Sequence, residues 1–230
     1  MNVLPITTVE AKPWIMQKHY AHRMPSVSWA FGMFDDGCLI GICTYGTPAS
    51  STLLRGVCGK RWKEYVCELN RLCLKYNRPN EASMLVSRSM KLLPKPKIVI
   101  SYADSGQGHI GYVYQACNFI YTGLSSKFRD PRVKGLESQH HATYAHGMSN
   151  AELREKYGER LYYIERDRKH RYVYFAGNKR DVNKMKQDLQ YPDLPYPKGE
   201  TKRYDAGAVL STQPLLFNPN DTTNRTSQGE

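Results

Sequence analysis

The sequence predicts an α/β protein, of α+β type in the order of its elements, with a mixed central sheet flanked by helices. Two apolar runs, 28–34 and 38–46, are joined by an Asp-Asp-Gly turn, and this pattern predicts a β-hairpin. Residues 66–93 read as a strand and a helix, and residues 97–124 as strand, loop, helix and strand, because the apolar period changes at each junction. The nearly continuous apolar run that opens the second unit is typical of a strand covered on both faces.

The chain begins with a predicted helix over residues 8–23, which Pro25 stops because the residue before a proline disfavours helix. The end of this helix carries His19, Tyr20 and His22. A solvated last turn, where the helix dipole favours cations, and a place in a functional site explain His19 and Tyr20 equally well. The solvated turn is the better explanation of His22.

Beyond the hairpin, a loop and a basic connector lead to a predicted strand over 66–74, which carries Glu68, Asn70 and Arg71 inside an otherwise apolar run. A charge in a buried strand is costly unless it has a partner. Two arrangements supply one: a structural Glu68–Arg71 pair, or a functional Arg71 that lies beside Asp104 on a neighbouring strand. We favour the functional arrangement for Arg71.

The next predicted helix covers residues 81–93, with Asn80 as its N-cap. A helix N-terminus that follows a strand offers free amide groups to a phosphate. Arg78, two residues before the cap, adds a positive charge there. The alternative is an ordinary helix start, since many helices begin this way.

A functional site is predicted in the unit at 97–124. Its strand ends at Asp104, a loop covers 105–108, and a helix over 109–117 carries Tyr114 about one and a half turns in. Open α/β sheets bind ligands at the carboxyl ends of their strands. Asp104 and Tyr114 are therefore candidate site residues.

Basic residues dominate two segments that follow this unit. The loop 127–135 and the run 166–171, which leads into an aromatic strand at 172–175, supply candidate nucleic-acid contacts: Lys127, Arg129, Arg132, Lys134, Arg168, Lys169 and Arg171. A solvated loop and an edge strand protected by charge are the structural alternatives. Short charged helices are predicted at 151–157 and 181–189. The three histidines at 140, 141 and 146 match no metal-ligand spacing and predict a polar loop.

Composition points to a polyanion as partner. The 230 residues include 33 Lys and Arg against 21 Asp and Glu, a formal charge of +12, and 17 tyrosines whose rings can stack on bases. A protein that merely has a basic surface is the alternative. The six cysteines form no CxxC pair and predict buried, reduced thiols in a cytoplasmic protein. No apolar run is long enough for a membrane span, and the N-terminus lacks a signal-peptide pattern, so no membrane partner is expected.

The chain is expected to form one catalytic domain over residues 1–200, including a basic C-terminal extension, followed by a flexible polar tail over 201–230. Gln, Asn, Thr, Ser and Gly dominate that tail. The sequence shows no internal repeat and does not predict an oligomeric state.

The order helix, hairpin, strand, helix, strand, helix, strand resembles the GCN5-related N-acetyltransferase (GNAT) fold. Residues 69–74 followed by 80–93 resemble that family's cofactor strand and pyrophosphate-binding helix, and residues 111–119 resemble its late helix. The resemblance implies acetyl-CoA as cofactor, held by Leu72, Cys73, Leu74, Arg78, Asn80, Ala82 and Ser83. It also implies that Tyr114 protonates a departing thiolate. One departure is Glu81, which stands where the family's pyrophosphate pattern has glycine.

Several strings resemble the Mom family of DNA adenine-modification proteins from phage Mu and its relatives. They are 19–23, 46–50, 68–72, 80–83, 101–104, 108–116 and 169–175, so the resemblance extends over about residues 15–200. It implies conversion of adenine in phage DNA to an N6-carbamoylmethyl derivative, which hides the genome from host restriction enzymes, and a location in the host cytoplasm. It also implies a site made of His19, Tyr20, Arg71, Asp104 and Tyr114.

The implied product constrains the chemistry. A carbamoylmethyl group is joined to nitrogen through its methylene, so simple aminolysis of a thioester does not make it. Either the acetyl methyl is activated, for which an iron ion is a candidate, or the donor is another group, such as one derived from glycine. The amine of adenine is a poor nucleophile that needs a base such as Asp104 or His19, and in a duplex it must be flipped out.

Two other functions compete with this one. An N-acetyltransferase acting on an amine of a protein, tRNA or small molecule would use the same fold. A non-catalytic nucleic-acid-binding module would use the same basic surface. The mass of any adduct on DNA nucleosides separates the three.

Overall fold

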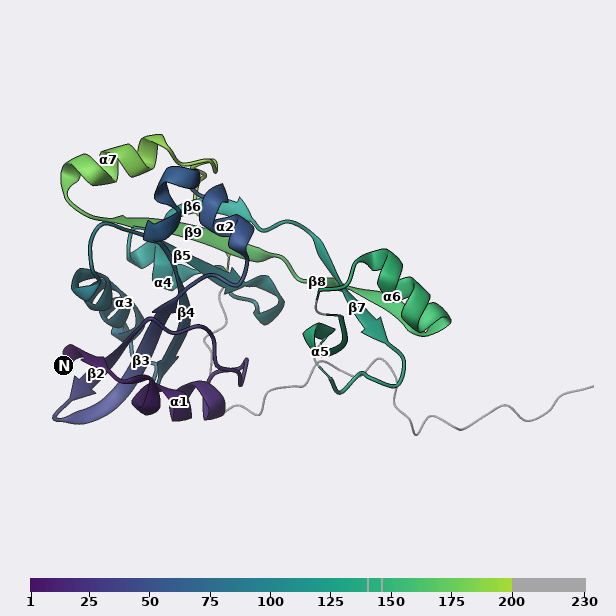
Figure 1. Ribbon diagram of the computed structural model, residues 1–230. Helices are drawn as coiled ribbons and strands as arrows, with labels where there is room; N and C mark the ends of the chain where they lie inside the picture. Colours follow the sequence, from purple (N-terminus) through teal and green to yellow (C-terminus); the bar gives the residue numbers. More distant parts are fainter. Residues whose placement is uncertain (140, 146, 200–230) are drawn as a thin grey trace, which may run out of the picture.

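The computed structural model of the chain describes residues 1–139, 141–145 and 147–199 (Figure 1). The helices are α1 Thr8–Gln17, α2 Ser51–Gly56, α3 Glu81–Leu92, α4 Tyr112–Ala116, α5 His141–Ala145, α6 Asn150–Tyr157 and α7 Lys179–Gln187, with 3₁₀ turns η1 Lys60–Tyr65, η2 Ser105–Gln107 and η3 Gly158–Arg160. The strands are β1 Asn2–Ile6, β2 Trp29–Asp35, β3 Cys38–Gly46, β4 Val66–Leu74, β5 Lys97–Asp104, β6 Ile120–Leu124, β7 Phe128–Val133, β8 Leu161–Arg166 and β9 Lys169–Ala176. The predicted tail, 201–230, lies outside the described residues.

A seven-stranded sheet with the order β1-β2-β3-β4-β5-β9-β6 forms the body of the protein. The β4–β5 pair is parallel and the other pairs are antiparallel. Helix α3 covers one face of the sheet, and α7 covers the other (Figure 1). The prediction of a mixed central sheet flanked by helices is therefore confirmed.

Strand β5 is buried on both faces, as its apolar run predicts. Ile98 and Ile100 pack in the cluster that includes Met185 of α7, whereas Val99 and Ala103 pack in the cluster that includes Leu85 of α3. This alternation follows from the two-residue period of a strand. The predicted bounds of β4 and β5 agree with the structure, and the two strands are neighbours as expected.

The hairpin is also confirmed. Its turn residues Asp36 and Gly37 have φ angles of 47° and 77°. These values fit a type I′ turn, whose twist matches the flanking strands.

Three helix predictions need correction. Helix α1 ends at Gln17 rather than 23, and His22 has a left-handed φ of 42°. Helix α4 begins at Tyr112 rather than 109, because Gly111 also lies in the left-handed region, at φ 85°. Asn80 does precede α3, but at φ 65° its side chain makes no capping bond.

The structure also overturns the prediction of a basic loop over 127–135. Most of that segment is strand β7, which pairs with β8 in a separate two-stranded sheet. With α5 and α6, these strands form an arm, residues 128–166, that projects from the body (Figure 1). The aromatic segment 172–175 belongs to β9, which lies between β5 and β6 and is not an edge strand. Helix α2 and turn η1 were not predicted.

The cysteines match the prediction of reduced thiols. All six are free, and all except Cys38 are buried. No helix among the described residues has both the length and the apolar character needed to cross a bilayer.

Candidate active site

A cavity of about 610 Å³ opens where β4 and β5 separate. The two strands pair only from Val66 to Leu69 of β4, because the next residue, Asn70, is an extra residue in the pairing of β4 with β3. Such a β-bulge bends its strand away from its neighbour. Residues 70–74 consequently lie along the cavity with no strand paired on their β5 side within the described sheet.

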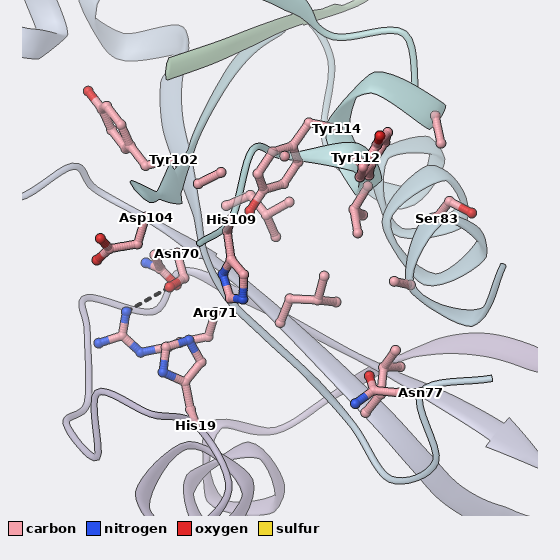
Figure 2. Close-up of a pocket in the computed structure, with 18 of the residues that line it drawn as sticks. His19, Asn70, Arg71, Asn77, Ser83, Tyr102, Asp104, His109, Tyr112 and Tyr114 are labelled. Carbon is pink, nitrogen blue, oxygen red and sulfur yellow. Dashed lines mark hydrogen bonds between the residues drawn. The ribbon is translucent and has the colours of Figure 1, made fainter. Parts of the chain in front are cut away.

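Figure 2 shows that the cavity has two ends with different side chains. His19, Arg71, Asp104 and His109 gather at one end, and the hydroxyl of Tyr114 points toward them. Asn77, Ser83 and Tyr112 lie at the other end, beside the start of α3. The five predicted catalytic residues, His19, Tyr20, Arg71, Asp104 and Tyr114, all line this one cavity. Their roles in catalysis stay predictions.

His19 is buried, with 7% of its surface exposed, just after α1. Its Nδ1 accepts a hydrogen bond of 3.1 Å from the Ala21 amide, which assigns the proton to Nε2. Burial lowers the pKa of His19 to about 3, and the charge of Arg71 adds to the effect. A neutral His19 can donate from Nε2 but is a weak base. The ring of Tyr20 stacks on it at 4.4 Å.

Arg71 holds the segment after α1 against β4. Its Nη2 donates to the carbonyl of Arg23 at 2.8 Å and its Nη1 to the carbonyl of Asn70 at 2.6 Å. Asn70 adds a bond of 2.8 Å from Nδ2 to the carbonyl of Ser26. That segment also passes so close to Gly46 that a Cβ there would lie 1.9 Å from the Ser26 carbonyl oxygen. Arg71 thus ties the segment that follows His19 to β4.

Asp104, at the end of β5, is already bound on both sides. Its carboxylate forms an ion pair of 3.1 Å with Nζ of Lys169 and accepts the Gly106 amide at 3.1 Å. Lys169 had been predicted as a nucleic-acid contact, but it lines the cavity and pairs with Asp104 across β5 and β9. Because Lys169 and the Gly106 amide already bind the carboxylate, Asp104 is better suited to holding Lys169 in place than to accepting a proton.

Glu68 lines the cavity and was not among the predicted site residues. Within the described part of the chain its carboxylate makes no hydrogen bond or ion pair. Burial raises its pKa, against the opposing charges of Arg71 and Lys169. A half-buried carboxylate without a partner, and with a raised pKa, is the type of group that acts as a general base. The sequence did signal it, as a charge inside an apolar strand, but a structural pairing with Arg71 explained that charge equally well.

Tyr114 lies on the opposite side of the cavity from β4, on α4. Its ring packs against Phe119 at 5.5 Å and Tyr172 at 5.3 Å, which fixes its direction. Burial raises the pKa of Tyr114 to about 12, and the charge of Glu68 contributes to the rise. The phenol therefore keeps its proton at neutral pH and can donate it.

His109 is a second cavity residue that the sequence did not reveal. The turn η2 brings it back toward β5, where its amide donates to the Asp104 carbonyl at 3.0 Å. Burial lowers the pKa of His109. No sequence pattern marked it, because its position depends on the turn at 105–108.

Six of the seven predicted cofactor contacts line the other end of the cavity: Leu72, Leu74, Arg78, Asn80, Ala82 and Ser83. Cys73 is the exception. Its thiol lies on the other face of β4, 3.8 Å from the carbonyl of Trp14, as alternation along a strand requires.

This end of the cavity fits the phosphates and the extended arm of an acyl-CoA. The amides of Ala82 and Ser83 begin α3 and have no acceptor within the described chain, so they can bind an anion. Glu81 does not obstruct them, because the residue is 1% exposed and its carboxylate accepts the Arg78 amide at 2.9 Å. The unpaired side of residues 70–74 can pair with an amide-containing chain.

An iron ion does not fit the described residues. No group of three or more His, Cys, Asp or Glu side chains lies close enough together within them to hold a metal.

The predicted nucleic-acid contacts are distributed over the arm and its base. Arg168 donates to the Ser125 carbonyl at 2.6 Å, and Arg171 stacks on Tyr191 at 3.4 Å, so both support the fold. Arg129 forms an exposed ion pair with Glu165 at 3.0 Å. The remaining side chains differ in exposure: Lys127 and Lys134 are exposed, and Arg132 is half-buried. Their contact with DNA stays a prediction.

The buried, neutral His19 makes stability depend on pH. Its folded pKa of about 3 lies below the ordinary 6.5, so the unfolded chain binds a proton that the folded chain refuses. Above pH 6.5 His19 is neutral in both states, so its burial carries no cost of discharging it. As the pH falls from 6.5 toward 3, the free energy of unfolding decreases by about 1.4 kcal/mol per pH unit. We expect His19→Asn, which keeps an acceptor for Ala21, to flatten the fall in unfolding free energy between about pH 6 and about pH 5. Urea denaturation of both chains measures it, and equal slopes would contradict it.

Comparison with known proteins gives a family match over most of the chain. The model of the Mom protein family matches residues 1–198. Methylcarbamoylase Mom of Escherichia phage Mu is 31% identical over 129 residues, which are 54% of this chain and 54% of that protein. The chain therefore matches about half the length of this curated relative.

Solved structures of GNAT acetyltransferases resemble the chain at low identity. One from Bacillus cereus is 12% identical, with a TM-score of 0.39, over 76% of this chain and 96% of its own. One from Bacillus subtilis, in complex with CoA, is 10% identical, with a TM-score of 0.36, over 74% and 84%.

Proposed function

The chain belongs to the Mom protein family, and from that premise we propose that it is a transferase that modifies N6 of adenine in DNA. The observation that carries the proposal is Glu68, a carboxylate without a partner that shares a cavity with the protonated phenol of Tyr114. The name of the phage Mu relative supports a carbamoylmethyl group as the product, and the charge of +12 supports DNA as the substrate.

The side chains of the cavity divide the proton transfers between them. As the bond from N6 to the carbon of the donor forms, Glu68 accepts the proton that N6 loses. As the bond from that carbon to its leaving group breaks, the phenol of Tyr114 supplies a proton to the leaving atom. Neutral His19 donates a hydrogen bond from Nε2, and Arg71 ties the segment that follows it to β4.

The donor would lie along β4 and α3. The amides of Ala82 and Ser83 would hold its phosphates, and the unpaired side of residues 70–74 would hold its arm. A bound acyl-CoA would carry its leaving thiolate on the carbonyl carbon, so displacement at that carbon would attach an acetyl group to N6. A carbamoylmethyl product instead requires a donor whose leaving group is on its methylene. The amide of a carbamoylmethyl product needs a nitrogen that acetyl-CoA lacks, so a glycine-derived donor remains the alternative.

The target adenine must leave the duplex to reach this cavity, because its N6 is paired inside the double helix. A carboxylate and phenols lining a space of about 610 Å³ can accommodate a single base. Phage DNA that carries the modified adenine would then escape cleavage by restriction enzymes in the host cytoplasm.

Mass spectrometry of nucleosides from plasmid DNA tests the proposal. We expect co-expression of the chain to add a deoxyadenosine whose mass is raised by a carbamoylmethyl group. An acetyl increment would instead support an ordinary N-acetyltransferase. Unmodified deoxyadenosine in cells that contain the folded protein would contradict both. DNA binding with no adduct would leave only the binding module.

A further inference from the structure

Two segments that cover the same face of the sheet concentrate positive charge. Segment 51–65 contains α2 and η1, and segment 179–190 contains α7. Together they hold eight Lys and Arg against three Asp and Glu, whereas the arm holds seven against six and is almost neutral. The positive charge of the protein is therefore unevenly distributed, and we call the outer surface of these two segments the basic face.

The two segments form one continuous surface. Trp62 Nε1 donates to Asp188 at 2.6 Å, and the Gln190 amide donates to the Val57 carbonyl at 2.8 Å. Their apolar side chains pack in one cluster beneath them, so their polar side chains point outward on one side of the sheet (Figure 1). Six exposed cations stand on this surface: Arg55, Lys60, Arg61, Lys179, Arg180 and Lys186.

The acidic residues of the basic face are engaged within the fold. Asp188 accepts the indole bond, and Asp181 accepts a bond of 2.8 Å from Asn178 at the start of α7. Glu64 pairs with its neighbour Lys63 at 3.2 Å. Within the described part of the chain, none of the six exposed cations forms an ion pair, so their charges face solvent without a bound carboxylate.

The basic face also lacks apolar anchors. Of the large apolar side chains in these two segments, all of which are described, only Tyr65 is exposed, at 37%. Proteins that lie on a membrane insert exposed aromatic or aliphatic side chains beside their cations. Cations without such side chains match the phosphate backbone of a nucleic acid.

A chain of contacts links the basic face to the cavity. Tyr191 follows α7 and lies beside α2, since a Cβ on Gly56 would lie 3.2 Å from its hydroxyl. The guanidinium of Arg171 stacks on the Tyr191 ring at 3.4 Å. Arg171 lies opposite Tyr102 in the sheet, so the two side chains point to the same face, and Tyr102 lines the cavity. The basic face thus continues to the cavity on this side of the sheet.

Glu68 points to the same side. Val66 packs in the cluster that includes Met185 of α7, and Glu68, two residues further along β4, has the same direction by strand alternation. The donor end of the cavity, with the amides of Ala82 and Ser83, lies beside α3 on the other side of the sheet. A DNA strand on the basic face and a donor along α3 would approach the carboxylate from opposite sides, so neither would block the other.

We infer that the basic face binds the phosphate backbone of DNA and brings the target adenine to the cavity. This inference deepens the proposed function, on which it rests, because it names the surface that holds the substrate. It assigns the main backbone contacts to α2, η1 and α7 and not to the almost neutral arm. Binding through such cations releases counterions from the DNA, which makes it strongly dependent on salt.

Fluorescence anisotropy of a labelled DNA duplex, titrated with the chain at several KCl concentrations and without a donor, tests the surface. We expect Arg55→Glu/Lys186→Glu to weaken binding about tenfold or more and to reduce the magnitude of the slope of log Kd against log [KCl] by about two, because each lost phosphate contact reduces it by about one. Arg55→Gln/Lys186→Gln removes the charges without reversing them and should give a smaller loss.

The matched control is Arg88→Glu/Lys91→Glu. It makes the same change of charge at exposed residues of α3, on the opposite side of the sheet. At about 0.1 M salt charges act over about 10 Å, so this control should weaken binding less than about twofold. Equal losses in the two double Glu variants, no loss in either, or tighter binding of an RNA duplex of the same sequence would overturn the inference.

Modification rates separate this inference from the proposed function. With a donor present, Arg55→Glu/Lys186→Glu should raise KM for duplex DNA about tenfold or more and leave kcat within about twofold, because the cavity is unchanged. A chain that modifies DNA but is slowed equally by both double Glu variants would keep the proposed function and overturn the surface. A chain that binds DNA through the basic face yet leaves deoxyadenosine unmodified would remove the proposed function and keep the surface.

Discussion

Replacing Glu68 by Gln is expected to lower kcat for adenine modification by about 10²–10⁴-fold, the usual contribution of a general base. The amide keeps the shape of the side chain but cannot take the proton from N6. Because Glu68 makes no hydrogen bond or ion pair within the described chain, the exchange breaks no contact that holds the fold. DNA binding should therefore be unchanged, and a gel-shift assay with the same oligonucleotide checks it.

The pH profile makes the test of Glu68 specific. Burial raises the pKa of this carboxyl, so kcat/KM of the intact enzyme should rise as pH increases through a value above the ordinary 4.5. The Gln variant should lose this rise. Glu64→Gln serves as the matched control, since Glu64 is 77% exposed and pairs with Lys63 at the surface. An intact rate in Glu68→Gln would show that another group is the base.

Replacing Tyr114 by Phe is expected to lower kcat by about 10²-fold or more, because the substitution removes only the proton donor. The ring contacts with Phe119 and Tyr172 remain, so the melting temperature should change little. The chemical step should be affected and binding of DNA should not, which single-turnover kinetics can resolve. Tyr65→Phe removes a hydroxyl from a 37% exposed tyrosine and is the control.

The size of the effect of Tyr114→Phe depends on whether the leaving group of the donor needs a proton. With a donor whose leaving group needs a proton, the loss should be largest near neutral pH, where the phenol with its pKa of about 12 is protonated. A rate within about twofold of the intact enzyme would exclude Tyr114 as the acid.

The sequence predicted best where burial alone decides the structure. Strands β4 and β5 could be placed to the residue, because long apolar runs with turn residues at their ends allow few alternatives. Asp104 and Tyr114 could be named because a strand end and the helix after it were both recognisable. The hairpin followed from the two residues that adopt positive φ.

Structure that depends on partners distant in sequence could not be predicted in this way. Strand β7, Phe128–Val133, has adjacent charges and an internal proline instead of a regular alternation, so it resembled a solvated loop. Its partner strand lies far along the chain, since the pair of Arg129 with Glu165 spans 36 residues. Lys169 reaches Asp104 only because β9 lies beside β5. Glu68 was not named as a site residue, because a structural pair with Arg71 was one explanation of its charge and the sequence could not show that Arg71 binds backbone carbonyls.

The place of β9 in the sheet affects how the protein is made on the ribosome. Strand β6 hydrogen-bonds to the rest of the sheet through β9, which is synthesised only after the whole arm. The same strand brings Lys169 to Asp104. A nascent chain that ends before Lys169 therefore leaves β5 with an open edge and a carboxylate without its lysine. The catalytic pocket is completed late in translation, in the same event that closes the sheet.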